Sequence, residues 1–324
     1  MSKALGLLSG GLDSSLAALC LKRQGIEVTA IAFVTPFFGS SKAEQAARLM
    51  DIPLIVENIS DVHLDMVKNP RYGYGKNMNP CIDCHAMMFR LAGEVMLERG
   101  FDFLFSGEVL GQRPMSQNAN ALRSVANYSG HPDRILRPLS AKLLQITSME
   151  EQGMVDRELL LDIQGRSRKP QEALAKEWQL TDFPSSGGGC LLTEIHFSDR
   201  LRDLFDHQPE CSVNDVELLK IGRQFRLSER AKLTLGRHQN DNEAIREAAN
   251  ETHVLLRTPG VAGPLGLISG EPSDHDLQTA GAILASYGKA KDQTHIEILA
   301  EAPGGEQRFT VSPMLREESQ KLIV

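Results

Sequence analysis

Seven residues near the N-terminus, SGGLDSS from Ser9 to Ser15, combine small, hydroxylated and acidic side chains between an apolar segment and an amphipathic one. Gly10 and Gly11 let backbone N–H groups curl around an anion, and serine hydroxyls and the next helix N-terminus add donors and positive dipole. The carboxylate of Asp13 suits a Mg²⁺ ion that bridges phosphates. The segment predicts a phosphate-binding loop, and the plain alternative is a glycine turn capped by Asp and Ser.

Two cysteines, Cys81 and Cys84, stand at CxxC spacing in NPCIDCH, and Cys190 follows a glycine run more than a hundred residues later. Three thiolates can hold one metal or an iron–sulfur cluster and leave an open position, where an iron without a protein ligand binds a reactant such as hydrosulfide. A structural zinc needs a fourth ligand, which His85 or Cys211 would supply. The same residues would also fit simple buried cysteines, or a redox pair of Cys84 and Cys190 that carries a persulfide and then a disulfide.

The literal CxxCH match to c-type haem attachment is rejected, because that modification needs export and the start MSKALGLLSGG breaks at glycines too early for a signal peptide. No apolar run approaches the ~20 residues that cross a bilayer. We therefore expect a cytoplasmic protein without a membrane segment and with mostly reduced cysteines.

A third polar segment begins where an apolar run ends, at SGE (106–108), and continues through GQRPMSQ (111–117). Ligands of open α/β sheets bind at the carboxyl ends of strands, so this segment is expected to face the nucleotide. An exposed polar loop is the alternative. The residues singled out for binding here are Ser106, Gly107, Gln112, Ser116 and Gln117.

The elements that must position these residues alternate between strand and helix patterns, which predicts a doubly wound α/β fold with a parallel sheet. Expected strands are 3–8, 27–34, 53–59, 101–108 and 134–141. Expected helices follow the glycine loop, cover 41–50, begin near Cys84, and occupy 146–155 and 171–180. After a flexible turn at 183–190, short strands and two helices, near 239–250 and 274–286, predict a smaller α+β domain. The expected division is a nucleotide-binding domain at 1–165, a linker and helical segment with Cys190 at 166–210, and the α+β domain at 211–324.

The charge of the 324-residue chain is uneven, although its formal net charge is −7. Residues 109–147 carry five basic side chains against one acidic, a net +4, and residues 220–237 carry six against one, a net +5. Such stretches neutralise phosphates or form solvated faces. Aromatic residues make up only 5% of the chain, which argues against stacking and favours recognition of a folded RNA by shape and phosphate contacts.

The complete Ser-Gly-Gly-x-Asp-Ser pattern resembles the signature of the PP-loop (adenine nucleotide alpha hydrolase, HUP-like) superfamily. That resemblance implies ATP cleavage between the α and β phosphates, with pyrophosphate held by Ser9, Gly10, Gly11, Ser14 and Ser15, and transfer of AMP to a substrate oxygen. The pattern G-x-x-x-x-G-K-[ST] is absent, so a cut at the γ phosphate is not indicated.

A PP-loop together with a Pro-Cys-x-x-Cys helix and a distal Gly-Cys resembles the tRNA thiolation enzymes. In members with three cysteines these residues hold a [4Fe–4S] cluster, which implies Cys81, Cys84 and Cys190 as its ligands here, whereas other members use two cysteines through a persulfide. The run from Gly111 to Gln117 resembles the Gly-Gln-x-x-Ser-Gln segment of 4-thiouridine synthetases with one extra residue.

The C-terminal segments LTLGRHQNDNEAI, HVLLRTPGVAG and DLQTAGAILASYGKAK resemble the NFACT-type RNA-binding domain over about 230–300, most clearly at Gly236, Arg237, Asn240 and Asn242. Together the resemblances imply an ATP-dependent tRNA sulfurtransferase with ATP, Mg²⁺ and a [4Fe–4S] cluster, catalytic Asp13, Cys81, Cys84 and Cys190, and a sulfur donor that is a cysteine desulfurase or inorganic sulfide. Two further classes of protein fit the sequence less well: a PP-loop ligase or amidotransferase-like enzyme, which leaves the cysteines without a task, and an RNA-binding module with a zinc site. The modified base, with uridine preferred, and the oligomeric state are not assigned.

Overall fold

The computed structural model describes residues 1–180, 189–289, 291–302 and 304–324, and the chain divides into two compact units, Met1–Thr193 and Glu194–Val324. The predicted glycine turn at 183–190 lies outside the described residues except for Gly189 and Cys190. None of the described helices is both long enough and apolar enough to cross a membrane.

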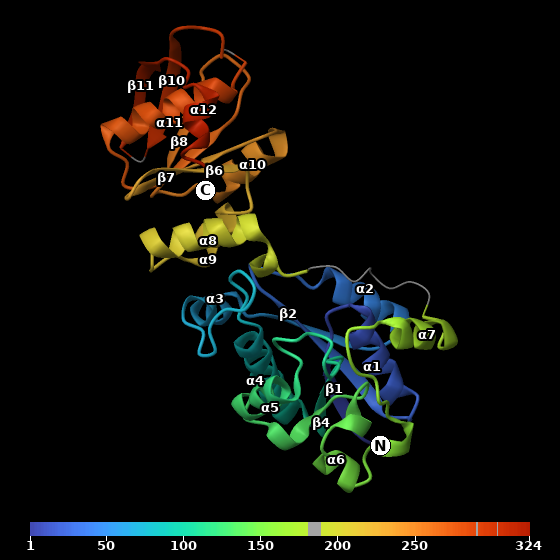
Figure 1. Ribbon diagram of the computed structural model, residues 1–324. Coiled ribbons are helices and arrows are strands. Elements are labelled where there is room, and N and C mark those ends of the chain that lie inside the picture. The colour runs from blue at the N-terminus through green and yellow to red at the C-terminus, as the bar shows by residue number, and fades with distance from the viewer. Residues whose placement is uncertain (181–188, 290, 303) are drawn as a thin grey trace. The chain divides into compact units, whose positions relative to one another are not determined.

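The first unit contains a parallel sheet of five strands in the order β3-β2-β1-β4-β5 (Figure 1). The strands are β1 (Lys3–Leu7), β2 (Glu27–Val34), β3 (Leu54–Asn58), β4 (Phe103–Ser106) and β5 (Ile135–Leu136). Each lies within a range predicted from the sequence. The chain reverses its winding direction between β1 and β4, and this switch point is where open α/β sheets bind ligands.

Both faces of this sheet are buried, because successive side chains of each strand point to opposite sides. Ala4 on β1 and Phe103 and Phe105 on β4 pack into one core with α1 and α2, whereas Leu5 and Leu104 pack into a second core with α4 and α5. Strands covered on both faces explain the near-continuous apolar runs in the sequence. The predicted doubly wound fold is thus confirmed.

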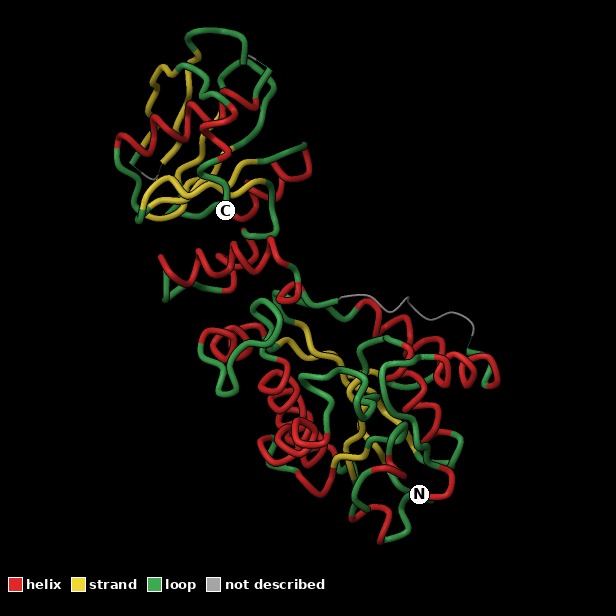
Figure 2. The backbone as a smooth tube through the Cα atoms, viewed as in Figure 1, coloured by secondary structure: helices red, strands yellow, loops and turns green. Residues whose placement is uncertain are grey.

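The helices of the first unit flank the sheet, as the smooth tube in Figure 2 also shows. They are α1 (Leu12–Lys22), α2 (Ser41–Met50), α3 (Ser60–Lys68), α4 (Cys81–Arg99), α5 (Ala119–Tyr128), α6 (Ser148–Glu151) and α7 (Lys169–Glu177). α4 ends at Gly100 in the left-handed region (φ 70°), and α7 has a proline in its first turn, as predicted. α3 and α5 were not predicted, and the helix expected over 146–155 shortens to the single turn of α6.

The second unit is an antiparallel sheet of six strands in the order β11-β10-β8-β9-β7-β6. Its strands are β6 (Arg223–Ser228), β7 (Ala231–Leu235), β8 (Val254–Arg257), β9 (Gly266–Gly270), β10 (Ile296–Ala302) and β11 (Gly305–Val311). Its helices are α8 (Ile195–His207), α9 (Val213–Leu218), α10 (Gln239–Ala248), α11 (Asp274–Tyr287) and α12 (Arg316–Gln320). All six strands, α10 and α11 were predicted, and the smaller α+β fold is confirmed.

The antiparallel sheet also separates two cores. Ile268 on β9 packs with α11 in the larger core, whereas its neighbour Leu267 packs with Leu218 and Ile245 from α9 and α10. Capping boxes begin α9 at Ser212 and α11 at Ser273.

Candidate functional site

The glycine-rich loop after β1 is held by its own hydroxyl groups and by close backbone contacts. Gly10 has φ +74°, and a Cβ there would lie 2.2 Å from the backbone carbonyl carbon of Lys42. The Ser14 hydroxyl donates to the Gly11 carbonyl oxygen (2.9 Å) and lies 3.2 Å from the Ser9 hydroxyl. Only glycine fits at position 10, so the backbone itself shapes this turn at the N-terminus of α1.

Asp13, in the first turn of α1, has one satisfied and one free carboxylate oxygen. Its Oδ2 accepts hydrogen bonds from Gln112 Nε2 (3.1 Å) and Arg168 Nη2 (2.9 Å). Its Oδ1 is buried and has no hydrogen-bond partner among the described residues. An unpaired carboxylate oxygen beside a phosphate-type loop fits a Mg²⁺ ion, which usually takes one or two carboxylates and completes its shell with phosphates and water.

The segment after β4 touches the loop directly. A Cβ at Gly107 would lie 2.4 Å from the Asp13 carbonyl carbon, so this glycine permits the close approach. The segment folds back where the Gly111 N–H donates to the Gln117 carbonyl (2.7 Å). Ser116 is buried, and so is Gln117, whose Oε1 has no partner in the described part of the chain. The predicted nucleotide residues of this segment therefore lie at the end of β4 against the loop.

The three predicted cysteines converge at the start of α4. Burial raises the pKa of the Cys81 thiol, while the positive charge of Arg113 and hydrogen bonds from Asn79 and Ser116 lower it. Burial and the neighbouring Cys190 and Cys81 raise the pKa of Cys84 well above its usual value. The three thiols are therefore close enough to influence each other's ionisation.

Cys190 is held near the other two cysteines because the residues that follow it form hydrogen bonds with the loop after β2 and the loop before α4. Burial raises the pKa of its thiol to about 11, against a lowering hydrogen bond from the backbone of Leu192. The Leu191 N–H donates to the Phe37 carbonyl (3.1 Å), and the Asn77 side chain donates to the Thr193 carbonyl (2.7 Å). These hydrogen bonds hold the segment after Cys190 against segments that lie more than a hundred residues earlier in the sequence.

The donor set at this place consists of three cysteine thiols, the ligand type of iron–sulfur clusters. Nowhere in residues 1–180, 189–289, 291–302 and 304–324 do three or more His, Cys, Asp or Glu side chains form a group that would hold one metal ion. A cuboidal cluster does not require such a group, because each of its thiolates binds a different iron. Cys84 is buried, Cys81 and Cys190 are partly buried, and three such thiols could act as ligands of a cluster. Positive charge at the site would favour their thiolates.

A buried histidine contacts the second cysteine of the pair. His63 on α3 is fully buried, and its Nε2 lies 3.2 Å from Cys84 Sγ. The rings of Phe37 and Phe38 lie on it, each with a centroid distance of 5.4 Å. Burial lowers the pKa of His63 to about 4, so the ring is neutral at physiological pH. Its Nδ1 has no partner among the residues described.

A buried carboxylate ties α4 to the strand ends. Glu108 accepts from Arg137 Nε (2.9 Å) and from the Ser106 hydroxyl (3.1 Å), and lies 2.8 Å from His85 Nδ1. Burial opposes ionisation of Glu108, but the Arg137 guanidinium and His85 outweigh it and lower its pKa to about 2. Arg137 was counted among the RNA-facing cations of 109–147, and that expectation is wrong because its side chain is only 7% exposed.

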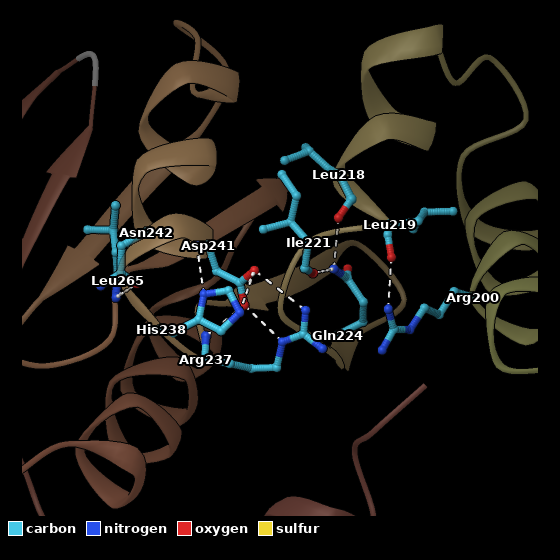
Figure 3. Close-up of polar contacts among 10 residues, drawn as sticks. All are labelled: Arg200, Leu218, Leu219, Ile221, Gln224, Arg237, His238, Asp241, Asn242 and Leu265. Atoms are coloured by element: carbon cyan, nitrogen blue, oxygen red, sulfur yellow. Dashed lines mark hydrogen bonds and ion pairs between the residues drawn. The ribbon is translucent and has the colours of Figure 1, made fainter. Parts of the chain in front are cut away.

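The C-terminal residues that resemble an RNA-binding domain mainly organise the fold (Figure 3). Arg237 Nε donates to Asp241 Oδ2 (2.8 Å), and the Leu265 N–H donates to Asn242 Oδ1 (2.9 Å). Asn242 Nδ2 also donates to the Gly263 carbonyl (3.2 Å), which fixes the loop before β9. Asp241 was not singled out from the sequence.

Neighbouring polar side chains in the same unit bind the carbonyl groups at and just after the C-terminal end of α9 (Figure 3). Gln224 Nε2 donates to the carbonyls of Leu218 (3.0 Å) and Ile221 (2.8 Å), and Arg200 Nη1 donates to that of Leu219 (2.8 Å). Lys232, one of the predicted surface cations of 220–237, is only 5% exposed. The surface charge of that stretch is therefore smaller than the sequence count.

Comparisons with known proteins agree with this division. Residues 1–142 match the family model described as thiamine biosynthesis protein (ThiI), and residues 222–323 match the model described as NFACT protein RNA binding domain. These matches confirm the resemblances predicted for the two ends of the chain. The first unit is thus similar to a PP-loop family, and the second to an RNA-binding domain.

Individual relatives are similar over parts of the chain. A curated Staphylococcus aureus (strain MRSA252) protein named "Probable tRNA sulfurtransferase" is 29% identical over 145 residues, which cover 42% of this chain and 34% of that protein. The chain thus spans about a third of the length of the curated relatives it matches.

Among solved structures, a 4-thiouridine synthetase–RNA complex with bound ATP has a TM-score of 0.35 and 22% identity, covering 55% of this chain and 50% of that one. The C-terminal part of a fibronectin/fibrinogen-binding protein from Streptococcus suis has a TM-score of 0.30 and 11% identity, covering 48% of this chain and 72% of that one.

Two contacts at the site were not predicted from the sequence. Arg168 precedes α7 and reaches Asp13 from 155 residues away, and His63 reaches Cys84 from 21 residues away. Neither residue belongs to a motif with recognisable spacing. The basic run around Arg168 is the only sequence signal for the first contact, and the second has none.

Proposed function

We propose that the chain is an ATP-dependent sulfurtransferase that acts on tRNA, adenylates a base carbonyl, of uridine by preference, and replaces its oxygen by sulfur. One observation carries the proposal: two consecutive residues join the two halves of the site. Gln112 donates to Asp13 in the loop, and the charge of Arg113 opposes the effect of burial on the thiols of Cys81 and Cys190. The similarity to a protein named as a tRNA sulfurtransferase supports the same reaction.

In the first proposed step, the base carbonyl oxygen attacks the α phosphate of ATP. A bond forms between this oxygen and the α phosphorus, the bond to the bridging oxygen breaks, and pyrophosphate leaves with the electron pair. Backbone N–H groups of the loop and the hydroxyls of Ser9, Ser14 and Ser15 would hold the leaving group. Asp13 would hold a Mg²⁺ ion, which would neutralise charge on the phosphates when bound.

In the second step, a sulfur nucleophile attacks the ring carbon and AMP leaves with the former carbonyl oxygen. Without adenylation the carbonyl oxygen of the base is a poor leaving group. Adenylation must therefore come first. Cys81, Cys84 and Cys190 would hold the [4Fe–4S] cluster, which would supply a binding place for the sulfur when present. In the persulfide alternative, the terminal sulfur of a cysteine persulfide is transferred and a disulfide is left between Cys84 and Cys190.

The second unit would bind the tRNA, because it matches an RNA-binding family model. Its exposed cations include Arg230 and Arg237. These side chains neutralise phosphates and release counterions, so binding should weaken as salt increases. The sulfur donor in the proposal is a cysteine desulfurase or inorganic sulfide.

The deciding experiment measures iron, zinc and acid-labile sulfide in protein purified without oxygen, together with tRNA-dependent formation of AMP and pyrophosphate. We expect about four irons and four sulfides per chain, broad absorption near ~400 nm, and AMP formation that requires tRNA. AMP formation without bound iron would replace the cluster by the persulfide route. Zinc without ATP turnover would overturn the enzyme and leave an RNA-binding module.

A further inference from the structure

An exposed aromatic surface lies next to the thiols, on the loop between α3 and α4 and at the end of α5. The chain has only four tyrosines, and three of them, Tyr72, Tyr74 and Tyr128, are here. Their exposed fractions are 45%, 41% and 43%. Composition averaged over the chain conceals this local concentration.

The side chains of this surface are already arranged against each other. The rings of Tyr72 and Tyr128 meet edge to face, with centroids 6.1 Å apart. The Arg71 guanidinium carbon lies 5.8 Å from the centroid of Tyr72 and 4.9 Å from that of Tyr128. Aromatic and guanidinium planes presented together are the groups on which unpaired nucleobases stack.

The backbone beneath these rings is held by the residue between the two cysteines of the CxxC pair. Asp83 is 1% exposed, and its carboxylate accepts from the N–H groups of Arg71 (3.1 Å) and Tyr72 (3.0 Å). The Tyr74 hydroxyl donates to the Val67 carbonyl (2.6 Å). The Tyr72 ring therefore sits on a loop that the thiol-bearing helix anchors, and the Tyr128 ring is presented by the end of α5.

The charge around the rings is complementary to RNA. Residues 66–80 and 109–132 contain no Asp or Glu, and they carry Lys68, Arg71, Lys76, Arg113 and Arg123. Asp83 and Glu108 at the thiol end are buried and hydrogen-bonded, and the exposed Asp65 and Asp133 lie just outside the two segments. A polyanion therefore meets only positive charge along these two segments.

We propose that Tyr72 and Tyr128, with Arg71 against both rings, form a stacking surface for an unpaired nucleobase of the RNA substrate. This inference rests on the proposed function and adds to it how the substrate is held beside the thiols. A base bound there lies on the same helix-and-loop unit as Cys81 and Cys84. The surface recognises the base plane, whereas the surrounding cations bind phosphates of any sequence.

The test compares two fluorescein-labelled 12-mers on the full chain: oligouridylate, and an abasic strand with the same number of phosphates. We expect oligouridylate to bind about tenfold more tightly than the abasic strand. The double variant Tyr72→Leu/Tyr128→Leu should lose this preference by weakening only oligouridylate. The matched control Tyr72→Phe/Tyr128→Phe keeps the rings and should keep the preference. Thermal unfolding checks that the variants remain folded.

Equal binding of the two strands by the unmodified protein would overturn the stacking surface, as would an equal loss for both strands in the leucine variant. An equal loss would be expected of a surface that binds phosphate or a protein partner. Thiolation and iron content are measured separately, so the outcomes remain distinguishable. A base preference without thiolation keeps the surface and rejects the proposed reaction, and thiolation without a base preference does the reverse.

Discussion

The two halves of the candidate site are built by different means. On the nucleotide side, the serine hydroxyls of the loop from Ser9 to Ser15 form hydrogen bonds between residues at most five positions apart, while Asp13 also takes partners from distant segments. On the thiol side, buried side chains from α3, α4 and the segment after α7 meet across more than a hundred residues of sequence. The hydroxyl groups of the first half are thus held locally, whereas the thiols of the second half are brought together only by the tertiary fold.

This difference means that the two halves should fail independently. Loss of a group on the nucleotide side removes phosphate or magnesium contacts without disturbing a core. Loss of a group on the thiol side removes a ligand or leaves a buried polar partner unsatisfied, which costs stability as well as function. Substitutions on either side therefore test whether the proposed division of roles is real.

The largest effect is expected for Cys190→Ala. Removal of one of three thiolates should abolish tRNA thiolation and lower the iron content, while ATP binding stays nearly unchanged because the loop is intact. Iron analysis and equilibrium binding of ATP measure the two halves in the same preparation. The matched control is Cys20→Ala, since Cys20 is a buried cysteine on α1, in the core that this helix forms with the sheet. Full thiolation by the Cys190 variant would reject its assignment as a ligand.

Asp13→Ala should produce the reciprocal result. Pyrophosphate release should fall by about a hundredfold to a thousandfold, because the carboxylate proposed to hold magnesium is lost. Iron content should not change. A quantitative assay of tRNA-dependent pyrophosphate release checks the first part and metal analysis the second. Loss of iron in this variant would mean that the two halves are not separate.

The buried carboxylate of Glu108, which ties α4 to the strand ends, should show its effect in stability. Glu108→Gln leaves Arg137 as a buried, uncompensated charge, which we expect to cost about 3–5 kcal/mol in the free energy of unfolding. Chemical denaturation measures it, with Glu98→Gln on the exposed side of α4 as the control. A loss within about 0.5 kcal/mol would show that the pair contributes little.

The same pair predicts an acid dependence with a defined sign. The folded pKa of Glu108, about 2, lies below the ordinary value of 4.5. The unfolded chain therefore binds more protons between these values, so the stabilisation is complete above about pH 4.5 and is lost as the pH falls toward 2. In Glu108→Gln this part of the pH dependence should disappear.

A smaller effect is expected from the backbone of the loop. Gly10→Ala places a Cβ where φ is +74° and the Lys42 backbone is 2.2 Å away, so we expect destabilisation of about 2 kcal/mol and loss of ATP binding. At Gly11 a Cβ would meet only the Ser9 hydroxyl at 3.4 Å, and Gly11→Ala should keep its stability. Thermal unfolding and ATP titration of the two variants compare them directly. Equal behaviour would show that the turn is not shaped by Gly10.

The same contrast explains which features were predictable from the sequence. Strand and helix periodicity places β1 to β4, and the loop motif lies between β1 and α1 because its glycines and serines act locally. All six strands of the second unit also follow from short β-branched and aliphatic runs between turn residues. α3 follows β3 almost directly and α5 follows the polar segment that ends at Gln117, so neither helix was distinguished from the segment before it.

Tertiary contacts explain what could not be predicted. The sequence counts Arg137 as a surface cation, and only the position of β5 beside β4 shows that it neutralises Glu108. The pairings of Arg168 with Asp13 and of His63 with Cys84 likewise need the fold. Residue type and spacing thus predicted the groups that meet within one loop, and not the partners that long-range packing supplies.

The smallest predicted effect concerns His63. A substitution there tests whether this histidine only fills the core or also stabilises the Cys84 thiolate through its 3.2 Å contact. His63→Leu removes a buried ring nitrogen, Nδ1, that has no partner in the described chain, so the metal-free protein should keep its stability or gain some. It also removes the 3.2 Å contact from Nε2 to Cys84, so iron retention against a chelator should fall about tenfold. Thermal unfolding of metal-free protein and the rate of iron loss from loaded protein are the two measurements. A loss of stability with unchanged iron retention would assign His63 to packing alone, because a hydrogen bond to a thiolate matters only when that thiolate carries charge.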